Sequence, residues 1–134
     1  KVRSDRVIIG HLDRKPMDPG YLRAIGDTGA FLSFDQIGTS DRFTDAERAR
    51  VILSLVEDGY RDQILLSEDY GRKSLLLAYG GAPGLAYLQE WFMVMLMETG
   101  LDAMAIRQMV VENAARALTI HSQTDAGARS TRAQ

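Results

Sequence analysis

The sequence has no cysteine among its 134 residues, so disulfides, thiolate metal ligands and cysteine nucleophiles are excluded. Neither sign of charge is in large excess: the net charge of −2 gives no electrostatic case for binding nucleic acid or an anionic membrane. The longest strongly apolar stretch, residues 85–97, is interrupted by Gln89 and Glu90 and is too short to span a bilayer. These absences fit a cytoplasmic protein, and we expect that location.

Short apolar runs alternate with helical patterns along the chain. The runs at 7–9, 30–34 and 64–66 predict three strands, each followed by a helix. Strands that alternate with helices imply a parallel sheet with helical crossovers, so the fold class is α/β with three consecutive βα units. We expect residues 1–121 to form these units. The small, polar and aperiodic segment 122–134 is expected to be disordered.

Capping residues mark the expected helices. Asp18 followed by Pro19 is typical of a helix start, and Thr44 with Glu47 has the spacing of a capping box. Asp102 is expected to cap the last helical stretch. A glycine-containing loop over 70–84 precedes a helix at about 85–99, and the segment NAARALTI at 113–120 predicts a short closing turn. A loop of that length in a compact domain is usually functional.

Three parallel strands leave two open sheet edges. Either more chain or another molecule must complete such a sheet. The arrangement therefore resembles part of a barrel. A self-assembling oligomer of the 134-residue chain, which would bury the same edges, remains an alternative at this point.

Two metal-capable side chains follow equivalent strands. His11 comes directly after the first apolar run and Asp69 after the third. The carboxyl ends of parallel strands are where α/β folds place their chemistry, and a carboxylate beside a metal can both ligate it and accept a proton from an activated water. Each residue also has a plain alternative: a strand-end histidine bonded to backbone, and a loop or N-cap aspartate.

Other polar residues are expected at the same sheet edge. Asp35 ends the middle strand and could orient a metal-bound histidine through a hydrogen bond. Gln36 follows it, and its side chain would lie at the same edge of the sheet. Tyr70 and Arg72 open the long loop and could contact a substrate. The alternative for each is a solvated or loop-capping side chain.

Five segments of the sequence carry a family resemblance: GHLDR at 10–14, FDQIGT at 34–39, LVEDGYRDQILLSED at 55–69, AYGG at 78–81 and ENAARALTI at 112–120. In order and spacing they resemble the C-terminal part of phosphotriesterase-like proteins of the amidohydrolase superfamily. The likeness is greatest to the phosphotriesterase-related branch, some members of which are named resiniferatoxin-binding. It implies that the strands are the sixth to eighth of a TIM (β/α)8 barrel that is incomplete in this chain.

The resemblance also implies the chemistry. His11 would ligate the more exposed metal and Asp69 the more buried one, with Asp69 also the catalytic base, while Gln36, Tyr70 and Arg72 would shape the substrate pocket. The cofactor would be two Zn²⁺ ions in the intact protein, with Fe, Mn or Co as alternatives. The family's other ligands have no counterpart in this sequence, so we expect at most partial metal occupancy and an inactive chain when alone.

Departures from the family pattern narrow the range of substrates that we expect. Gln36 and Arg14 stand where phosphotriesterases proper carry a histidine and an aspartate implicated in proton relay. This favours hydrolysis of a lactone or carboxyl ester over efficient phosphotriester hydrolysis. The expected partners are such a small molecule, the missing N-terminal barrel portion and a second copy in a dimer. A non-catalytic small-molecule binding protein on the same scaffold is the alternative function.

Overall fold

The computed structural model describes residues 2–14, 17–39 and 42–120, and within them the three expected strands form one parallel sheet. The strands are β1 (Ile8–Ile9), β2 (Phe31–Phe34) and β3 (Ile64–Leu66), in the spatial order β1-β2-β3. Ile9 is paired with Leu32, and Leu32 with Ile64. The α/β class and the three-stranded parallel sheet predicted from the alternating pattern are confirmed.

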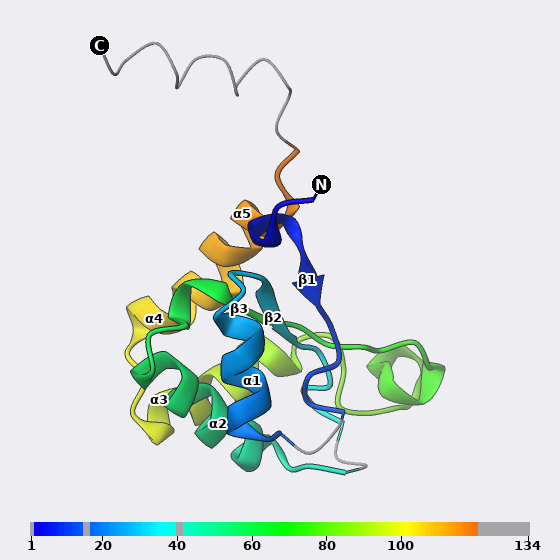
Figure 1. Ribbon diagram of the computed structural model, residues 1–134. Coiled ribbons are helices and arrows are strands. Elements are labelled where there is room, and N and C mark those ends of the chain that lie inside the picture. The colour runs from blue at the N-terminus through cyan, green and yellow to red at the C-terminus, as the bar shows by residue number, and fades with distance from the viewer. Residues whose placement is uncertain (1, 15–16, 40–41, 121–134) are drawn as a thin grey trace, which may run out of the picture.

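Helices cover the sheet face on which Ile9, Leu32 and Ile64 lie. They are α1 (Pro19–Gly26), α2 (Asp45–Glu57), α3 (Met93–Thr99), α4 (Ala103–Arg107) and α5 (Asn113–Leu118) (Figure 1). The core combines this face of the sheet with apolar residues of the helices, such as Ile52 and Leu96, both fully buried. On the opposite face Ile8 remains 41% exposed. Successive side chains of a strand point to opposite faces, so this is the face that a closed barrel would turn inward.

The helix starts follow the capping residues. The Asp18 carboxylate accepts the N–H of Gly20, and Thr44 and Glu47 form both bonds of the capping box. Asp102 accepts the N–H of Ala105 at the start of α4. These three predictions are confirmed, because a cap needs only residues that are close in the sequence.

The C-terminal helices differ from expectation in two ways. Two π-helical turns, Leu88–Phe92 and Gln108–Glu112, interrupt the predicted helices. The expected closing turn is wrong, since residues 113–118 form the helix α5. Asn113 is fully buried, and its amide donates to the carbonyls of Arg61 and Ile64 at 2.8 Å each. These bonds fix α5 against the start of β3.

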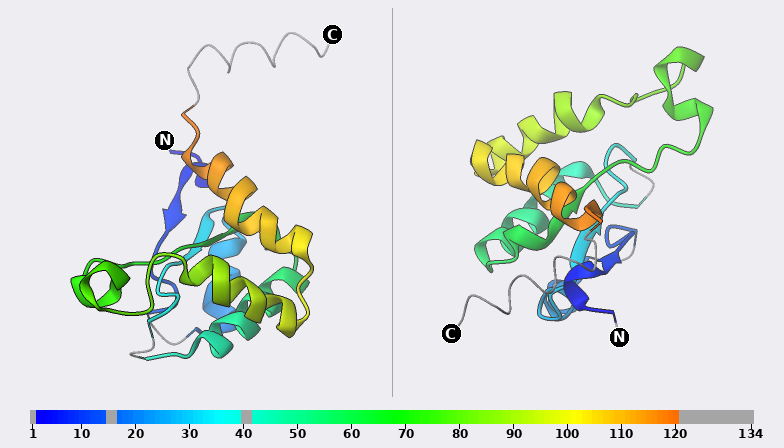
Figure 2. Two further views of the ribbon diagram at one scale, coloured as in Figure 1. Left: turned by 180° about the vertical axis from the view of Figure 1, so that it is seen from behind. Right: turned by 90° about the horizontal axis from the view of Figure 1, so that it is seen from above.

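The loop after β3 extends away from the body of the molecule. Figures 1 and 2 show this segment (green) projecting from the sheet and helices. It contains two 3₁₀ turns, Lys73–Leu75 and Leu77–Tyr79. No helix in the described ranges is long and apolar enough to cross a membrane. The predicted disordered tail, 122–134, lies outside the described residues.

Candidate metal and substrate site

The carboxyl ends of β1 and β2 are joined by His11 and Asp35. His11 has a φ of 59°, in the left-handed region that only a few non-glycine residues adopt. Its ring Nδ1 lies 2.6 Å from Oδ1 of Asp35, and its backbone N–H donates to Oδ2 at 2.9 Å. The bond from Nδ1 leaves Nε2 of the half-exposed ring available for a metal. The predicted role of Asp35 as a partner of His11 has the geometry it requires.

His11 and Asp35 each shift the pKa of the other so that both charged forms are favoured. The hydrogen bond and the negative charge of Asp35 raise the pKa of His11, and the charge of Arg14 works weakly against that rise. Burial acts to raise the pKa of Asp35, but the bonds from His11 and Gln36 outweigh it and hold that pKa below its ordinary value. Without a metal, the pair is therefore stabilised as an ion pair.

The side chain of Gln36 connects these residues to Asp69. Its Nε2 lies 3.1 Å from Oδ2 of Asp69 and 3.2 Å from Oδ1 of Asp35, and 3.5 Å from Nδ1 of His11. Residues from the ends of all three strands thus meet around one amide group. The structure brings together four of the six residues singled out in the sequence.

A buried charge cluster, which the sequence did not reveal, supports the loops that carry these residues. Nε of Arg48 donates to Oδ2 of Asp13 at 3.0 Å, and Nη1 donates to Asp45 at 2.8 Å. Asp13 in turn accepts the backbone N–H groups of Asp35 and Gln36 at 3.2 and 2.9 Å. The cluster therefore fixes the start of the loop that follows β2.

Tyr70 and Arg72 are not drawn into the same group. The Tyr70 hydroxyl is buried without a hydrogen-bond partner in the described part of the chain. Burial, with the nearby charges of Glu68 and Asp45, raises its pKa. Arg72 is exposed and makes no ion pair with another described residue. Their assignment to the substrate pocket stays a prediction.

The metal ligands available in this chain are few. Within residues 2–14, 17–39 and 42–120, no three histidine, aspartate or glutamate side chains group closely enough to hold a metal ion. His11 and Asp69 offer a neutral imidazole and a carboxylate, which are donors that zinc accepts. They fit part of a metal site, and a complete one needs further donors. The ligand assignments remain predictions.

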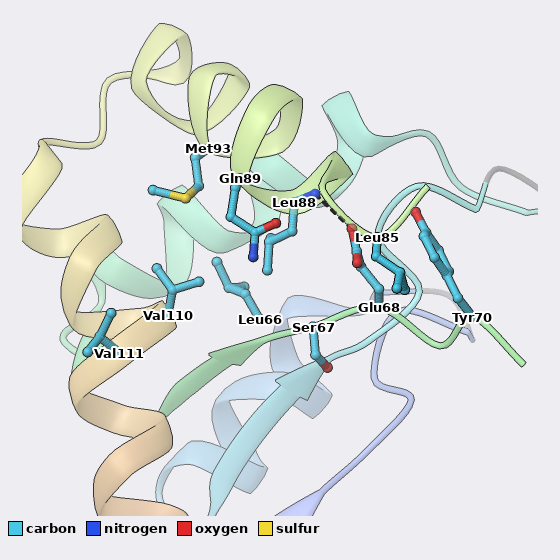
Figure 3. Close-up of a pocket in the computed structure, with 10 residues that line it drawn as sticks. All are labelled: Leu66, Ser67, Glu68, Tyr70, Leu85, Leu88, Gln89, Met93, Val110 and Val111. Carbon is cyan, nitrogen blue, oxygen red and sulfur yellow. Dashed lines mark hydrogen bonds between the residues drawn. The ribbon is translucent and has the colours of Figure 1, made fainter. Parts of the chain in front are cut away.

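A cavity of about 660 Å³ lies beside the open edge of β3. Figure 3 shows its lining, in which Leu66 of β3 faces Leu88 and Met93 on one side and Val110 on the other. Glu68 reaches across to accept the N–H of Leu88 at 2.7 Å (Figure 3). Neither His11 nor Asp69 lines this mainly apolar cavity.

The sequence profile of the phosphotriesterase family matches residues 2–118. The chain belongs to the phosphotriesterase family. The chain is 34% identical over 108 residues to the phosphotriesterase homology protein of Escherichia coli, covering 81% of this chain and 36% of that protein. It is 27% identical over 124 residues to the N-acetyltaurine hydrolase of Danio rerio, covering 85% and 35%.

Solved structures of the family superpose on the three βα units. A resiniferatoxin-binding protein from Rhodobacter sphaeroides matches with a TM-score of 0.78 at 37% identity, over 85% of this chain and 34% of that chain. A lactonase from Listeria monocytogenes matches with a TM-score of 0.83 at 35% identity, over 90% and 38%. This phosphotriesterase-family chain thus corresponds to part of a TIM barrel and spans little more than a third of the length of these relatives.

Proposed function

We propose that this chain is the C-terminal part of a metal-dependent hydrolase that acts on ester, lactone or phosphotriester bonds. The observation that supports this most is the convergence of His11, Asp35 and Asp69 on the amide of Gln36. Three separate strand ends supply these groups, which is the arrangement that TIM-barrel enzymes use. The phosphotriesterase family is a binuclear-metal family, which supports the same chemistry.

Each of the four residues would have its own role in metal binding or proton transfer. His11 would hold a metal through Nε2, and Asp35 would fix its ring through Nδ1. Asp69 would be the second ligand and the proton acceptor. A metal in such a site supplies an activated water and polarises the substrate oxygen. Gln36 would hold the orientation of Asp69 through its 3.1 Å bond.

The working site needs donors that this chain does not provide. We propose that an N-terminal barrel portion, carrying the remaining strands and ligands, pairs with the open edges of β1 and β3. Part of that portion would cover the cavity beside β3, where Leu66, Leu88 and Val110 leave an apolar surface. The assembled barrel would then form a homodimer.

The names of the relatives support the substrate class. A lactonase and organophosphorus hydrolases are among the matched structures. Gln36 is an amide rather than an acid or base, so it cannot relay a proton from Asp69. This favours a lactone, whose leaving alkoxide stays attached to the product, or a carboxyl ester over a phosphotriester.

A second candidate is a small-molecule binding protein without catalysis. The resiniferatoxin-binding protein from Rhodobacter sphaeroides, at 37% identity, favours it. This candidate keeps the fold and the cavity but does not need a complete metal site.

In the deciding experiment, this chain is co-expressed with a second chain that carries the first five βα units of the Escherichia coli phosphotriesterase homology protein, and the complex of the two is purified. The complex is loaded with Zn²⁺ and assayed on a lactone, an aryl ester and a phosphotriester. We expect hydrolysis that is lost in Asp69→Asn and His11→Ala and kept in Glu98→Gln, an exposed control on α3. A metal-loaded complex that binds resiniferatoxin but hydrolyses nothing would favour the second candidate.

A further inference from the structure

The two ends of the long loop after β3 pack against one glycine of the neighbouring loop. A Cβ atom on Gly38 would overlap the hydroxyl oxygen of Tyr70. It would also lie 2.9 Å from Cδ1 of Tyr87 and 3.1 Å from Cγ of Pro83, closer than packed carbon atoms ordinarily approach. Tyr70 precedes residues 71–82, which we call the arm, and the other two side chains follow them. The lack of a side chain at position 38 therefore lets these three residues close the base of the arm.

Gly38 and the far end of the base are held by the same carboxylate. Gly38 has a φ of 79°, in the left-handed region that glycine adopts without strain, and its N–H donates to Asp45 at 3.2 Å. The hydroxyl of Tyr87 donates to that carboxylate at 2.9 Å. Asp45 is in turn paired with the buried Arg48. The backbone on which Tyr70 rests is thus fixed to α2.

The contact of Tyr70 with Gly38 is one of packing and not of hydrogen bonding. The Tyr70 hydroxyl is buried and has no hydrogen-bond partner among the described residues. A hydroxyl that fills the space of a missing Cβ is not free to contact a substrate at the mouth of the barrel. The position of this side chain therefore suits a role in holding the loop.

The loop that carries Gly38 also holds Asp69, the residue next to Tyr70. Asp69 accepts a hydrogen bond from Nε2 of Gln36 at 3.1 Å, and Gln36 lies two residues before Gly38. Gln36 also forms an isolated antiparallel bridge with Glu68. Three consecutive residues of one loop are thus held by the other, and a shift of Tyr70 moves Asp69 because a single rigid peptide unit joins them.

The arm keeps its structure through bonds between its two halves. Backbone N–H groups donate from Gly81 to Leu76, from Ala82 to Ser74 and from Gly84 to Leu75, at 3.1, 3.0 and 2.9 Å. Figure 2 shows the arm projecting from the body of the molecule. Bonds within so short a segment persist only while its ends are held together, because free ends restore the conformational entropy of the chain. The closed base therefore keeps the arm folded.

We propose that Tyr70 is a positioning residue, which closes the base of the arm over Gly38 and thereby fixes Asp69. This role differs from the substrate contact that the sequence predicts for Tyr70. The closure of the base stands on the packing alone, and its effect on Asp69 in catalysis rests on the proposed hydrolase function.

The first test measures the arm in the metal-free chain. Trypsin cuts after Arg72 and Lys73, two exposed residues of the arm, and mass spectrometry follows these cuts. Gly38→Ala pushes the side chain of Tyr70 off the base, and we expect the cuts to be about tenfold faster. The matched control is Gly59→Ala, which has a left-handed backbone at a φ of 95° but open space around its Cβ. It should be cut in the arm at the rate of the unmodified chain.

A second substitution tests the contact itself. In Gly38→Ala/Tyr70→Phe the overlapping oxygen is gone, so we expect most of the protection from trypsin to return. Hydrogen exchange separates this local effect from general unfolding. In Gly38→Ala the amides of Gly81 and Ala82 should exchange faster, while the amide of Ile52 in α2 keeps its rate.

Three results would overturn the closure of the base. One is equal cutting of the arm in Gly38→Ala and Gly59→Ala. Another is a double variant that remains as easily cut as Gly38→Ala. The third is faster exchange of Ile52 together with the amides of the arm, which would mean that the whole fold opens.

The second test concerns catalysis in the assembled, metal-loaded protein. Gly38→Ala should lower kcat for a lactone about tenfold or more with little change in KM, because Asp69 is displaced while substrate binding is kept. Adding Tyr70→Phe to Gly38→Ala should restore part of kcat, and Gly59→Ala should leave both constants unchanged.

The kinetic outcomes separate this proposal from the proposed hydrolase. A raised KM at unchanged kcat in Gly38→Ala would indicate that Tyr70 contacts the substrate, which would overturn the positioning role and leave the hydrolase. Loss of arm protection in Gly38→Ala, without hydrolysis even by the unmodified protein, would support the closure of the base and contradict the hydrolase.

Discussion

Arg48 and Asp13 form an ion pair whose side chains are 2% and 0% exposed, with Nε and Oδ2 3.0 Å apart. It joins α2 to the loop after β1. Asp13 uses the same carboxylate to hold the backbone after β2, so the pair connects the packing of a helix to the position of Asp35 and Gln36. The support of the site is thus buried, whereas His11 itself is half exposed.

Removal of the Arg48 charge should destabilise the chain strongly. Arg48→Met leaves the carboxylates of Asp13 and Asp45 buried without their partner, and we expect a loss of about 3–5 kcal/mol in the free energy of unfolding. Urea denaturation measures it. The matched control, Arg50→Met on the exposed face of α2, should change the free energy by less than about 0.5 kcal/mol. Equal unfolding midpoints for the two variants would contradict this account of the cluster.

Two tyrosines that lie near Asp45 should respond differently to loss of their hydroxyl groups. The Tyr87 hydroxyl donates to Asp45 at 2.9 Å, and Tyr87→Phe should cost about 1 kcal/mol. The Tyr70 hydroxyl is buried without a described partner, so Tyr70→Phe should cost nothing or stabilise the fold. Thermal unfolding of both variants, each compared with the unmodified chain, tests the difference. A larger loss in Tyr70→Phe than in Tyr87→Phe would show that the Tyr70 hydroxyl has a bonding partner.

The capping box of α2 gives a local prediction. Thr44→Ala removes the bonds of the hydroxyl to Glu47, and we expect a loss of about 1 kcal/mol. Thr44→Ser keeps the hydroxyl and serves as the control. Helix content by circular dichroism during urea unfolding would reveal the loss, and an unchanged midpoint in Thr44→Ala would count against the cap.

The His11–Asp35 pair should make the metal-free chain sensitive to pH in a defined direction. The pKa of His11 is raised above its ordinary 6.5, so its contribution is complete below that value and is lost as pH rises through the folded pKa. The pKa of Asp35 is lowered below 3.8, so its contribution is complete above that value and is lost as pH falls through the folded pKa. The pair therefore stabilises most between about pH 4 and 6.5.

NMR titration of the His11 ring measures this directly. Asp35→Asn should bring the pKa of His11 down toward 6.5 and flatten the pH dependence of stability over the same interval. Asp58→Asn, which removes an acid that pairs with Arg23 far along the chain, should leave the His11 titration unchanged. The prediction fails if Asp35→Asn leaves the His11 pKa where it is.

Local features of this fold could be predicted from the sequence, and long-range ones could not. The strand 64–66 and the caps at Asp18, Thr44 and Asp102 depend on neighbouring residues, and the structure confirms them. The helix at 113–118 was missed because Asn113 is held by backbone carbonyls about fifty residues away. Nothing near Asn113 in the sequence indicates that bond.

The candidate site shows the same division. The positions of His11, Asp35 and Asp69 at strand ends follow from the alternating pattern, and their approach follows from parallel pairing. The Asp13–Arg48 pair joins residues 35 positions apart and was missed. One signal did exist, because Arg48 precedes Ile52 by four residues and so lies on the inward stripe of α2. A charged residue on such a stripe indicates a buried partner.

Native mass spectrometry of the purified protein, followed by a denaturing mass on the same sample, tests the central claim most directly. The account predicts a companion fragment or a longer chain that carries about two metal ions, as a binuclear hydrolase requires. It also predicts that His11→Ala and Asp69→Asn reduce the metal content. A lone 134-residue chain that stays metal-free in every oligomeric state would contradict the claim that His11 and Asp69 are ligands of a working site.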